Sequence, residues 1–128
     1  MTTRRHVVAV LDDDPVVLQA VGRLLTASGY GIELYGSAEE FLSVTSSQAT
    51  CLVVDVQLGD ISGIELGRHL AANGFKFPII FMTASEDETL RDQALEFGCV
   101  AFLYKSRLRE QLKEAVAKAT ASHPAPKK

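Results

Sequence analysis

Three aspartates in two parts of the sequence are the residues best suited to carry chemistry. Asp12 and Asp13 directly follow the apolar run HVVAVL, and Asp55 lies inside the apolar run CLVVDV. A carboxylate on an apolar strand is costly to bury unless a cation or a hydrogen-bond donor pairs with it. If the two runs form neighbouring strands, the carboxylates lie about 5–8 Å apart, where like charges either raise a pKa or bind a cation. An all-oxygen cluster suits a hard divalent cation, and we expect Mg²⁺.

A hydroxyl group and an amine follow two further apolar runs. Thr83 and Ala84 follow FPIIFM, and Lys105 follows VAFLY. A hydroxyl and an ammonium beside a metal site supply the donors that a transferring phosphoryl group needs. Together these residues predict a metal-assisted phosphoryl-transfer site in which Asp55 is the nucleophile.

Each of these residues also has a purely structural interpretation. Asp14 precedes Pro15 and is most simply a helix cap. The other aspartates could be loop or turn residues, the threonine an ordinary strand-end hydroxyl, and the lysine a surface residue. Their joint occurrence at the ends of successive apolar runs favours the site over these separate explanations.

The runs that carry these residues predict a parallel sheet. Four of them are almost wholly apolar, as in strands that helices cover on both faces, while GIELY alternates and is expected at an edge. The expected strands are 6–11, 31–35, 51–56, 77–82 and 100–104.

Amphipathic segments with helix start signals lie between the strands. The first is expected to begin at Asp14-Pro15, and Ser106 is expected to cap the last. Capping-box spacing predicts further starts at three serine–glutamate pairs. These pairs are Ser37/Glu40, Ser62/Glu65 and Ser85/Glu88. Five strand–helix units in succession predict an α/β fold, in which ligands bind at the carboxyl ends of the strands.

Composition narrows the class of protein. The chain has 128 residues, of which 47% are hydrophobic, and this suffices for one packed domain. Its net charge of −3 argues against a nucleic-acid-binding surface, and no apolar run approaches the roughly 20 residues that span a membrane. The short apolar run after Arg4 and Arg5 does not read as a signal peptide, so we expect a cytoplasmic protein. Cys51 and Cys99 are expected to be free, buried thiols.

Four motifs in chain order resemble the receiver domain of two-component response regulators, of the single-domain, chemotaxis-regulator-like type. They are VLDDDP, VVDVQLGDISGIEL, IIFMTA and AFLYKS, and the resemblance covers nearly the whole chain. It implies a (βα)₅ flavodoxin-like, doubly wound parallel sheet with strand order 2-1-3-4-5. The receiver domain would span residues 1–121, followed by a flexible tail over 122–128. Asp55 would accept a phosphoryl group from a sensor histidine kinase or a phosphotransfer protein.

The resemblance also implies a role for each residue at the metal. Asp13 and Asp55 would ligate Mg²⁺ directly, together with the backbone carbonyl of Gln57. Asp12 would act mainly through a bound water.

Further roles follow at the phosphoryl group and beyond it. Thr83 and Ala84 would lie against the phosphoryl group, with the Thr83 hydroxyl as donor, and Lys105 would neutralise its charge. Phe102 falls at the aromatic switch position of the family, although it also suits a half-buried core. Phosphorylation would rearrange the face formed by the fourth helix, fifth strand and fifth helix, and so regulate a downstream protein target or a fused output domain. The chain would catalyse only its own phosphorylation and dephosphorylation and would not otherwise be an enzyme.

Two positions depart from the family pattern. Gly59 stands where the family usually has proline, so the loop after Asp55 is expected to be more mobile. Ser106 stands where proline usually follows the lysine, so the Lys105–Ser106 peptide bond is expected to be trans. Both departures leave the reactive groups in place.

The sequence leaves two other functions open. An aspartyl-nucleophile phosphatase of the haloacid dehalogenase type would need a second aspartate two residues after Asp55, where this chain has Gln57. A receiver-like interaction module could keep the fold and signal without phosphate, which the Gly59 and Ser106 departures motivate. Acetyl phosphate or beryllofluoride with Mg²⁺ would separate such a module from a phosphoacceptor.

Overall fold

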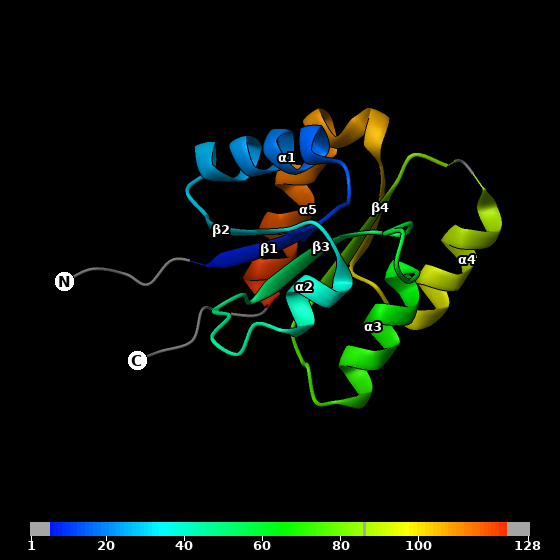
Figure 1. Cartoon of the computed structure of the whole chain (residues 1–128). Coiled ribbons are helices and arrows are strands. Elements are labelled where there is room, and N and C mark those ends of the chain that lie inside the picture. Colours follow the sequence, from blue (N-terminus) through cyan, green and yellow to red (C-terminus); the bar gives the residue numbers. More distant parts are fainter. Residues whose placement is uncertain (1–5, 86, 123–128) are drawn as a thin grey trace.

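A parallel sheet forms the middle layer of the protein (Figure 1). The structure is a computed structural model, and it describes residues 6–85 and 87–122. Within these residues the sheet has five strands in the order β2-β1-β3-β4-β5, and every neighbouring pair is parallel. The strands are β1 (Val7–Leu11), β2 (Gly31–Tyr35), β3 (Cys51–Asp55), β4 (Ile79–Thr83) and β5 (Ala101–Tyr104). Strand order and direction confirm the predicted doubly wound α/β fold.

Helices cover both faces of the sheet (Figure 1). The helices of the described residues are α1 (Pro15–Ala27), α2 (Ala38–Leu42), α3 (Gly63–Ala72), α4 (Glu88–Phe97) and α5 (Leu108–Ser122). A short 3-10 turn, Lys105–Arg107, precedes α5. Helices α1 and α5 lie on one face of the sheet, and α2, α3 and α4 lie on the other. Within the described part of the chain, no helix is long and apolar enough to cross a membrane.

Alternate residues of the central strands fill two separate cores. On β1, Val8 and Val10 pack toward α1 and α5, whereas Ala9 and Leu11 pack toward the opposite helices. A strand covered on both faces needs apolar residues at every position, which explains the unbroken apolar runs in the sequence. Strand β2 is at an edge, as predicted, and there Leu34 stays partly exposed.

Asp14 and Ser37 cap helices as the sequence predicts. Asp14 Oδ1 accepts a hydrogen bond from Val16 N at 2.9 Å, and Pro15 is the first residue of α1. Ser37 Oγ accepts one from the backbone N of the capping-box glutamate at 3.0 Å. Each bond satisfies a backbone N–H that has no acceptor within the first helical turn.

The predicted start of α4 at Ser85 is wrong. Asp87 is the N-cap, and its Oδ1 accepts a hydrogen bond from Thr89 N at 2.8 Å. Ser85 Oγ accepts a bond from Asp87 N at 3.1 Å, so it supports the turn that leads to the cap. The helix begins at the aspartate because an aspartate is as good a cap as a serine and lies closer to the helical turn.

The predicted cap at Ser106 is also wrong, and the one at Ser62 holds in part. Ser106 lies inside the 3-10 turn, which has no side-chain cap. The turn begins at Lys105, so Ser106 is already inside a helical turn and is not the residue that precedes it. Ser62 caps α3, but it accepts its hydrogen bond from Ile64 N at 3.2 Å rather than from Glu65.

Three smaller predictions have clear outcomes. Cys51 and Cys99 are free, the first buried and the second half-buried. No cis peptide bond occurs among the described residues, so the bond before Ser106 is trans as predicted. Helix α5 includes Ser122, the first residue of the expected tail, whereas 123–128 and the two N-terminal arginines lie outside the described residues.

Candidate functional site

The predicted site residues meet at one edge of the sheet, where four strands end. Asp12 and Asp13 directly follow β1, and Asp55 is the last residue of β3. Thr83 is the last residue of β4, and Lys105 follows β5. The strand order reverses between β1 and β3, and sheets of this type bind ligands beside the carboxyl ends at such a reversal. We call this group of residues the acidic edge.

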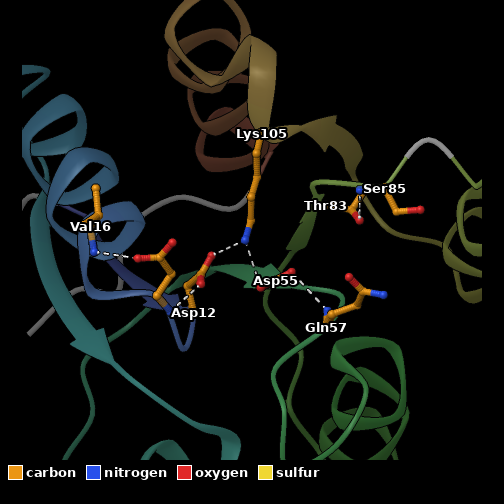
Figure 2. Close-up of polar contacts among 8 residues, drawn as sticks. Asp12, Val16, Asp55, Gln57, Thr83, Ser85 and Lys105 are labelled. Atoms are coloured by element: carbon orange, nitrogen blue, oxygen red, sulfur yellow. Dashed lines mark hydrogen bonds and ion pairs between the residues drawn. The ribbon is translucent and has the colours of Figure 1, made fainter.

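Lys105 joins two buried aspartates of the acidic edge (Figure 2). Its Nζ lies 2.8 Å from Asp12 Oδ2 and 3.0 Å from Asp55 Oδ2. Asp12 is fully buried and Asp55 is 3% exposed, whereas the lysine side chain keeps 19% of its exposure. The lysine therefore supplies the cation that the burial of a carboxylate on an apolar strand requires.

The environment of these groups shifts their pKa values. Burial raises the pKa of Asp55, and the charge of Asp12 adds to the rise, while hydrogen bonds from Gln57 N and Lys105 oppose it. Burial lowers the pKa of Lys105, but its contacts with the two aspartates outweigh burial and leave the pKa above its ordinary value. The lysine therefore stays charged at neutral pH, beside a carboxylate whose charge is only partly compensated.

The three aspartates also fit a divalent cation. Asp12, Asp13 and Asp55 each offer an oxygen, and these oxygens lie within 4.8 Å of one another. Asp12 Oδ1 accepts a hydrogen bond from Asp14 N at 2.8 Å. The buried Asp12 Oδ2 finds no hydrogen bond of good geometry among the described residues, despite its ion pair with Lys105. Mg²⁺ prefers carboxylate oxygens and needs only a few protein ligands, so the residues present fit this ion.

The loop after Asp55 folds back onto the strand that carries it. Gln57 N donates a hydrogen bond to Asp55 Oδ1 at 3.0 Å, and Gln57 pairs with Ser62 in an antiparallel bridge. Gly63 N donates to Val56 O at 2.7 Å. The backbone of Gln57 is thereby held beside the carboxylate, where a backbone ligand is expected.

Gly63 belongs to this site although its role was not predicted. It is the first residue of α3, and a β-carbon here would collide with the backbone carbonyl of Asp55 and lie 2.9 Å from Val54 Cγ1. Only glycine lets the helix begin so close to the strand end. The sequence held a signal for this role: glycine is a poor helix former, yet Gly63 stands at the first helical position, directly after the capping residue Ser62.

Gly59 has a backbone conformation that proline cannot adopt. Its φ of +95° lies in the left-handed region, and a β-carbon here would lie 3.1 Å from Asp13 Oδ2. Proline is restricted to φ near about −65°. Proline would therefore not fit the path that this loop takes, whereas the greater mobility of the loop stays a prediction.

Thr83 is buried at the acidic edge, while two other predicted residues lie further out. Thr83 Oγ1 accepts a hydrogen bond from Ser85 N at 3.0 Å (Figure 2). Ala84 is exposed, and Phe102 is half-buried on β5. The ring of Phe102 meets that of Tyr104 edge-on, with centroids 5.8 Å apart. The roles predicted for these residues remain predictions.

The sequence and the fold both have close counterparts among known proteins. The family profile of the response regulator receiver domain matches residues 8–117, a range that contains every predicted site residue. The chain belongs to this receiver family. Membership leaves the haloacid dehalogenase-type interpretation without support, since Gln57 also lacks the carboxylate that such a phosphatase needs.

Curated relatives of the receiver are longer than this chain. Response regulator protein TodT of Pseudomonas putida is 35% identical over 117 residues, which cover 91% of this chain and 52% of TodT. Transcriptional regulatory protein FixJ of Bradyrhizobium diazoefficiens is 34% identical over 124 residues, which cover 93% of this chain and 60% of FixJ. The receiver thus spans little more than half the length of these relatives.

Solved structures share the fold, one over its whole length and another over part of it. The crystal structure of FixJ-N has a TM-score of 0.84 and 28% identity, and the match covers 98% of this chain and 100% of FixJ-N. Full-length FixJ from B. japonicum has a TM-score of 0.76 and 32% identity, with 96% of this chain and 62% of that one covered. The receiver therefore corresponds to one domain of the longer protein.

Proposed function

We propose that this receiver accepts a phosphoryl group on Asp55 from the phosphohistidine of a sensor histidine kinase or a phosphotransfer protein. The observation that carries the proposal is the bridge that Lys105 forms between Asp12 and Asp55 at the end of a buried sheet. A buried ion pair is weak support for stability. Burial raises the pKa of Asp55, and a fixed cation and two further acids lie beside it. Such a perturbed carboxylate is typical of a functional group.

The reaction needs a nucleophilic oxygen and donors for the charge of the transferred group. An oxygen of Asp55 would form a bond to phosphorus while the bond from phosphorus to the imidazole nitrogen breaks, and the electron pair of that bond stays on the imidazole. Lys105 Nζ, 3.0 Å from Asp55 Oδ2, would neutralise charge on the phosphoryl oxygens. Thr83, buried at the end of the adjacent strand, would donate its hydroxyl to the same oxygens, beside the backbone of Ala84.

Asp13, Asp55 and the backbone carbonyl of Gln57 would hold Mg²⁺ at the acidic edge, and Asp12 would act mainly through a bound water. When bound, the ion supplies positive charge that reduces repulsion between the carboxylates and the phosphoryl oxygens. The chain itself orients these ligands. Asp14 N fixes Asp12, and Gln57 N fixes Asp55. Gly59, which has no β-carbon, leaves room beside Asp13.

Phosphorylation would act on the face formed by α4, β5 and α5. The modified side chain carries a charge of about −2 and several strong acceptors. Thr83 would turn toward it and weaken its present bond with Ser85 N, and Phe102 would move into the space that Thr83 leaves. This cytoplasmic receiver would then contact a downstream protein target or a fused output domain. It would modify only its own aspartate and would turn over no separate substrate.

Intact-mass measurement tests the proposal. The chain and its Asp55→Asn variant are treated with acetyl phosphate, once with Mg²⁺ and once with EDTA. We expect a single phosphoryl adduct on the unmodified chain with Mg²⁺ and none in the other three samples. Asp92→Asn, an exposed position on α4, is the matched control and should be phosphorylated normally. An adduct on Asp55→Asn would contradict the assignment, and no adduct on the folded chain would favour the phosphorylation-independent interaction module.

A further inference from the structure

Asp60 connects the loop of the acidic edge to helix α2. Its Oδ2 accepts a hydrogen bond from Glu39 N at 3.1 Å, and its Oδ1 makes a longer one with Ala38 N at 3.5 Å. Oδ1 also accepts a bond from Ile61 N at 3.0 Å, inside its own loop. The contacts to α2 join positions 21 and 22 residues apart in the sequence. A single side chain thus ties the turn after β3 to the start of a different helix.

We expect the hydrogen bonds between Asp60 and α2 to affect the position of the loop more than the free energy of unfolding. Helix α2 already has its own cap, because Ser37 Oγ accepts a hydrogen bond from Glu40 N. Asp60 and Glu39 are both exposed, so water can replace the carboxylate at these N–H groups. Hydrogen bonds at exposed sites have a small net effect on stability for this reason. Among the described residues, in contrast, the loop makes no other hydrogen bond to α2.

The same loop lies against the predicted metal ligands on its inner side. Gly59, the residue before Asp60, is so close to Asp13 that a β-carbon would lie 3.1 Å from Asp13 Oδ2. At the start of the loop, Gln57 N donates a hydrogen bond to Asp55 Oδ1. A shift of the outer end of the loop would therefore change the space beside two carboxylates of the acidic edge.

We propose that Asp60 is a positioning residue for the metal site. By holding the loop on α2, it keeps the Gln57 carbonyl and the Asp13 carboxylate at a spacing that suits Mg²⁺. This inference rests on the proposed function, because Mg²⁺ is the ligand concerned. Residues that orient metal ligands without touching the metal typically account for about 10- to 100-fold in affinity, and the exposure of Asp60 places it at the lower end.

Magnesium titration of the unphosphorylated protein, followed by NMR chemical shifts, tests the inference. We expect Asp60→Ala to raise the dissociation constant for Mg²⁺ about tenfold. Asp60→Asn removes the same charge but keeps one acceptor oxygen for the α2 N–H groups, so its increase should be clearly smaller. Glu39→Ala removes a neighbouring exposed carboxylate from α2 and controls for the loss of charge. Its dissociation constant should stay close to that of the unmodified chain.

The rate of phosphorylation by acetyl phosphate gives a second readout. Asp60 is not among the groups that contact the phosphoryl group, so the maximal rate at saturating Mg²⁺ should stay within about twofold while the half-saturating concentration rises. Equal effects of Asp60→Ala and Asp60→Asn would show that charge alone acts and would overturn the positioning role, as would an unchanged dissociation constant in Asp60→Ala.

The two readouts also separate this inference from the proposed function. If the unmodified chain binds Mg²⁺ but forms no phosphoryl adduct, the proposed function fails, and the dissociation constants of the three variants, compared with that of the unmodified chain, still decide the role of Asp60. If the unmodified chain does not bind Mg²⁺, both proposals are overturned.

Discussion

The ammonium group of Lys105 lies 2.8 Å from Asp12 Oδ2, slightly closer than it lies to Asp55 Oδ2 at 3.0 Å. Asp12 is also the more deeply buried of the two acids, and Lys105 is its only ion-pair partner within the described residues. Lys105 is thus the counter-ion of a buried acid pair before any phosphoryl group arrives. This double role makes the stability of the protein depend on the cations at the acidic edge.

Removing the Lys105 ammonium should destabilise the protein mainly when Mg²⁺ is absent. Lys105→Met leaves two buried carboxylates without their cation, which we expect to lower the free energy of unfolding by about 1–3 kcal/mol. Mg²⁺ should restore part of this loss, because it places positive charge among the same oxygens. Urea denaturation with Mg²⁺ and with EDTA measures both effects. Lys113→Met, exposed on α5, should change stability by less than about 0.5 kcal/mol. A loss of the same size with and without Mg²⁺ would contradict the argument.

Replacing Gly63 should strain the junction of β3 and α3. Alanine is the better helix former, so any loss in Gly63→Ala must come from the collision of its β-carbon with the Asp55 carbonyl and with Val54. We expect the free energy of unfolding to fall by about 1–3 kcal/mol, as for other overpacked sites. Gly36→Ala is the control, since a β-carbon there meets nothing closer than Glu40 Oε2 at 3.7 Å. Thermal or urea denaturation measures the stability of both variants. Equal stability of Gly63→Ala and Gly36→Ala would refute the prediction.

The acidic edge could be predicted from the sequence because parallel strands bring their carboxyl ends together. Asp55 and Lys105 lie 50 residues apart in the chain, yet each lies at the end of an apolar run, and the topology places both at the same edge of the sheet. The bond between Asp60 and α2 could not be predicted in this way. It joins a loop to the first turn of a helix. Their relative position depends on the packing of α2, and neither segment carries a pattern that specifies the other.

Some helix starts followed the local sequence signal, and others did not. Asp14 is one of three consecutive aspartates, but Pro15 marks the first helical position after it, and Asp14 caps α1. Ser85 and Asp87 are both good caps two residues apart, and the path of the loop into α4 decides between them. At Ser106, the chain enters a 3-10 turn at the preceding lysine, whose side chain reaches Asp12 and Asp55. At both serines the sequence correctly indicated that a helical segment begins nearby, but the tertiary structure determines the residue at which it begins.

His6 should make stability depend on pH at the opposite end of the sheet. Its Nδ1 lies 2.7 Å from Thr50 Oγ1, and burial lowers the pKa of His6 below the ordinary value of 6.5. The folded protein therefore binds this proton more weakly than the unfolded chain does. The contribution of neutral His6 to stability is therefore fully present above the pKa that His6 has in the unfolded chain. It is lost as the pH falls from that value through the lower pKa of the folded protein.

Urea denaturation between about pH 7.5 and about pH 5.5 measures this effect. The free energy of unfolding should fall less over this range in His6→Gln than in the unmodified chain. His69→Gln, at an exposed position of α3, should keep the pH dependence of the unmodified chain. Identical pH dependence of His6→Gln and the unmodified chain would show that His6 does not carry it.

Thr83 should couple phosphorylation to the face formed by α4, β5 and α5. Its Oγ1 accepts a hydrogen bond from Ser85 N at 3.0 Å, in the segment that leads to α4, so a turn of Thr83 toward a phosphoryl group would disturb that segment. Thr83→Ala should still form the adduct on Asp55, because the nucleophile and Lys105 remain. It should lose most of the NMR shift changes that beryllofluoride with Mg²⁺ produces at Phe102 and along α4. Thr26→Ala, exposed on α1, should keep them. If Thr83→Ala shows the full set of shift changes, the signal reaches this face by a route that does not involve its hydroxyl.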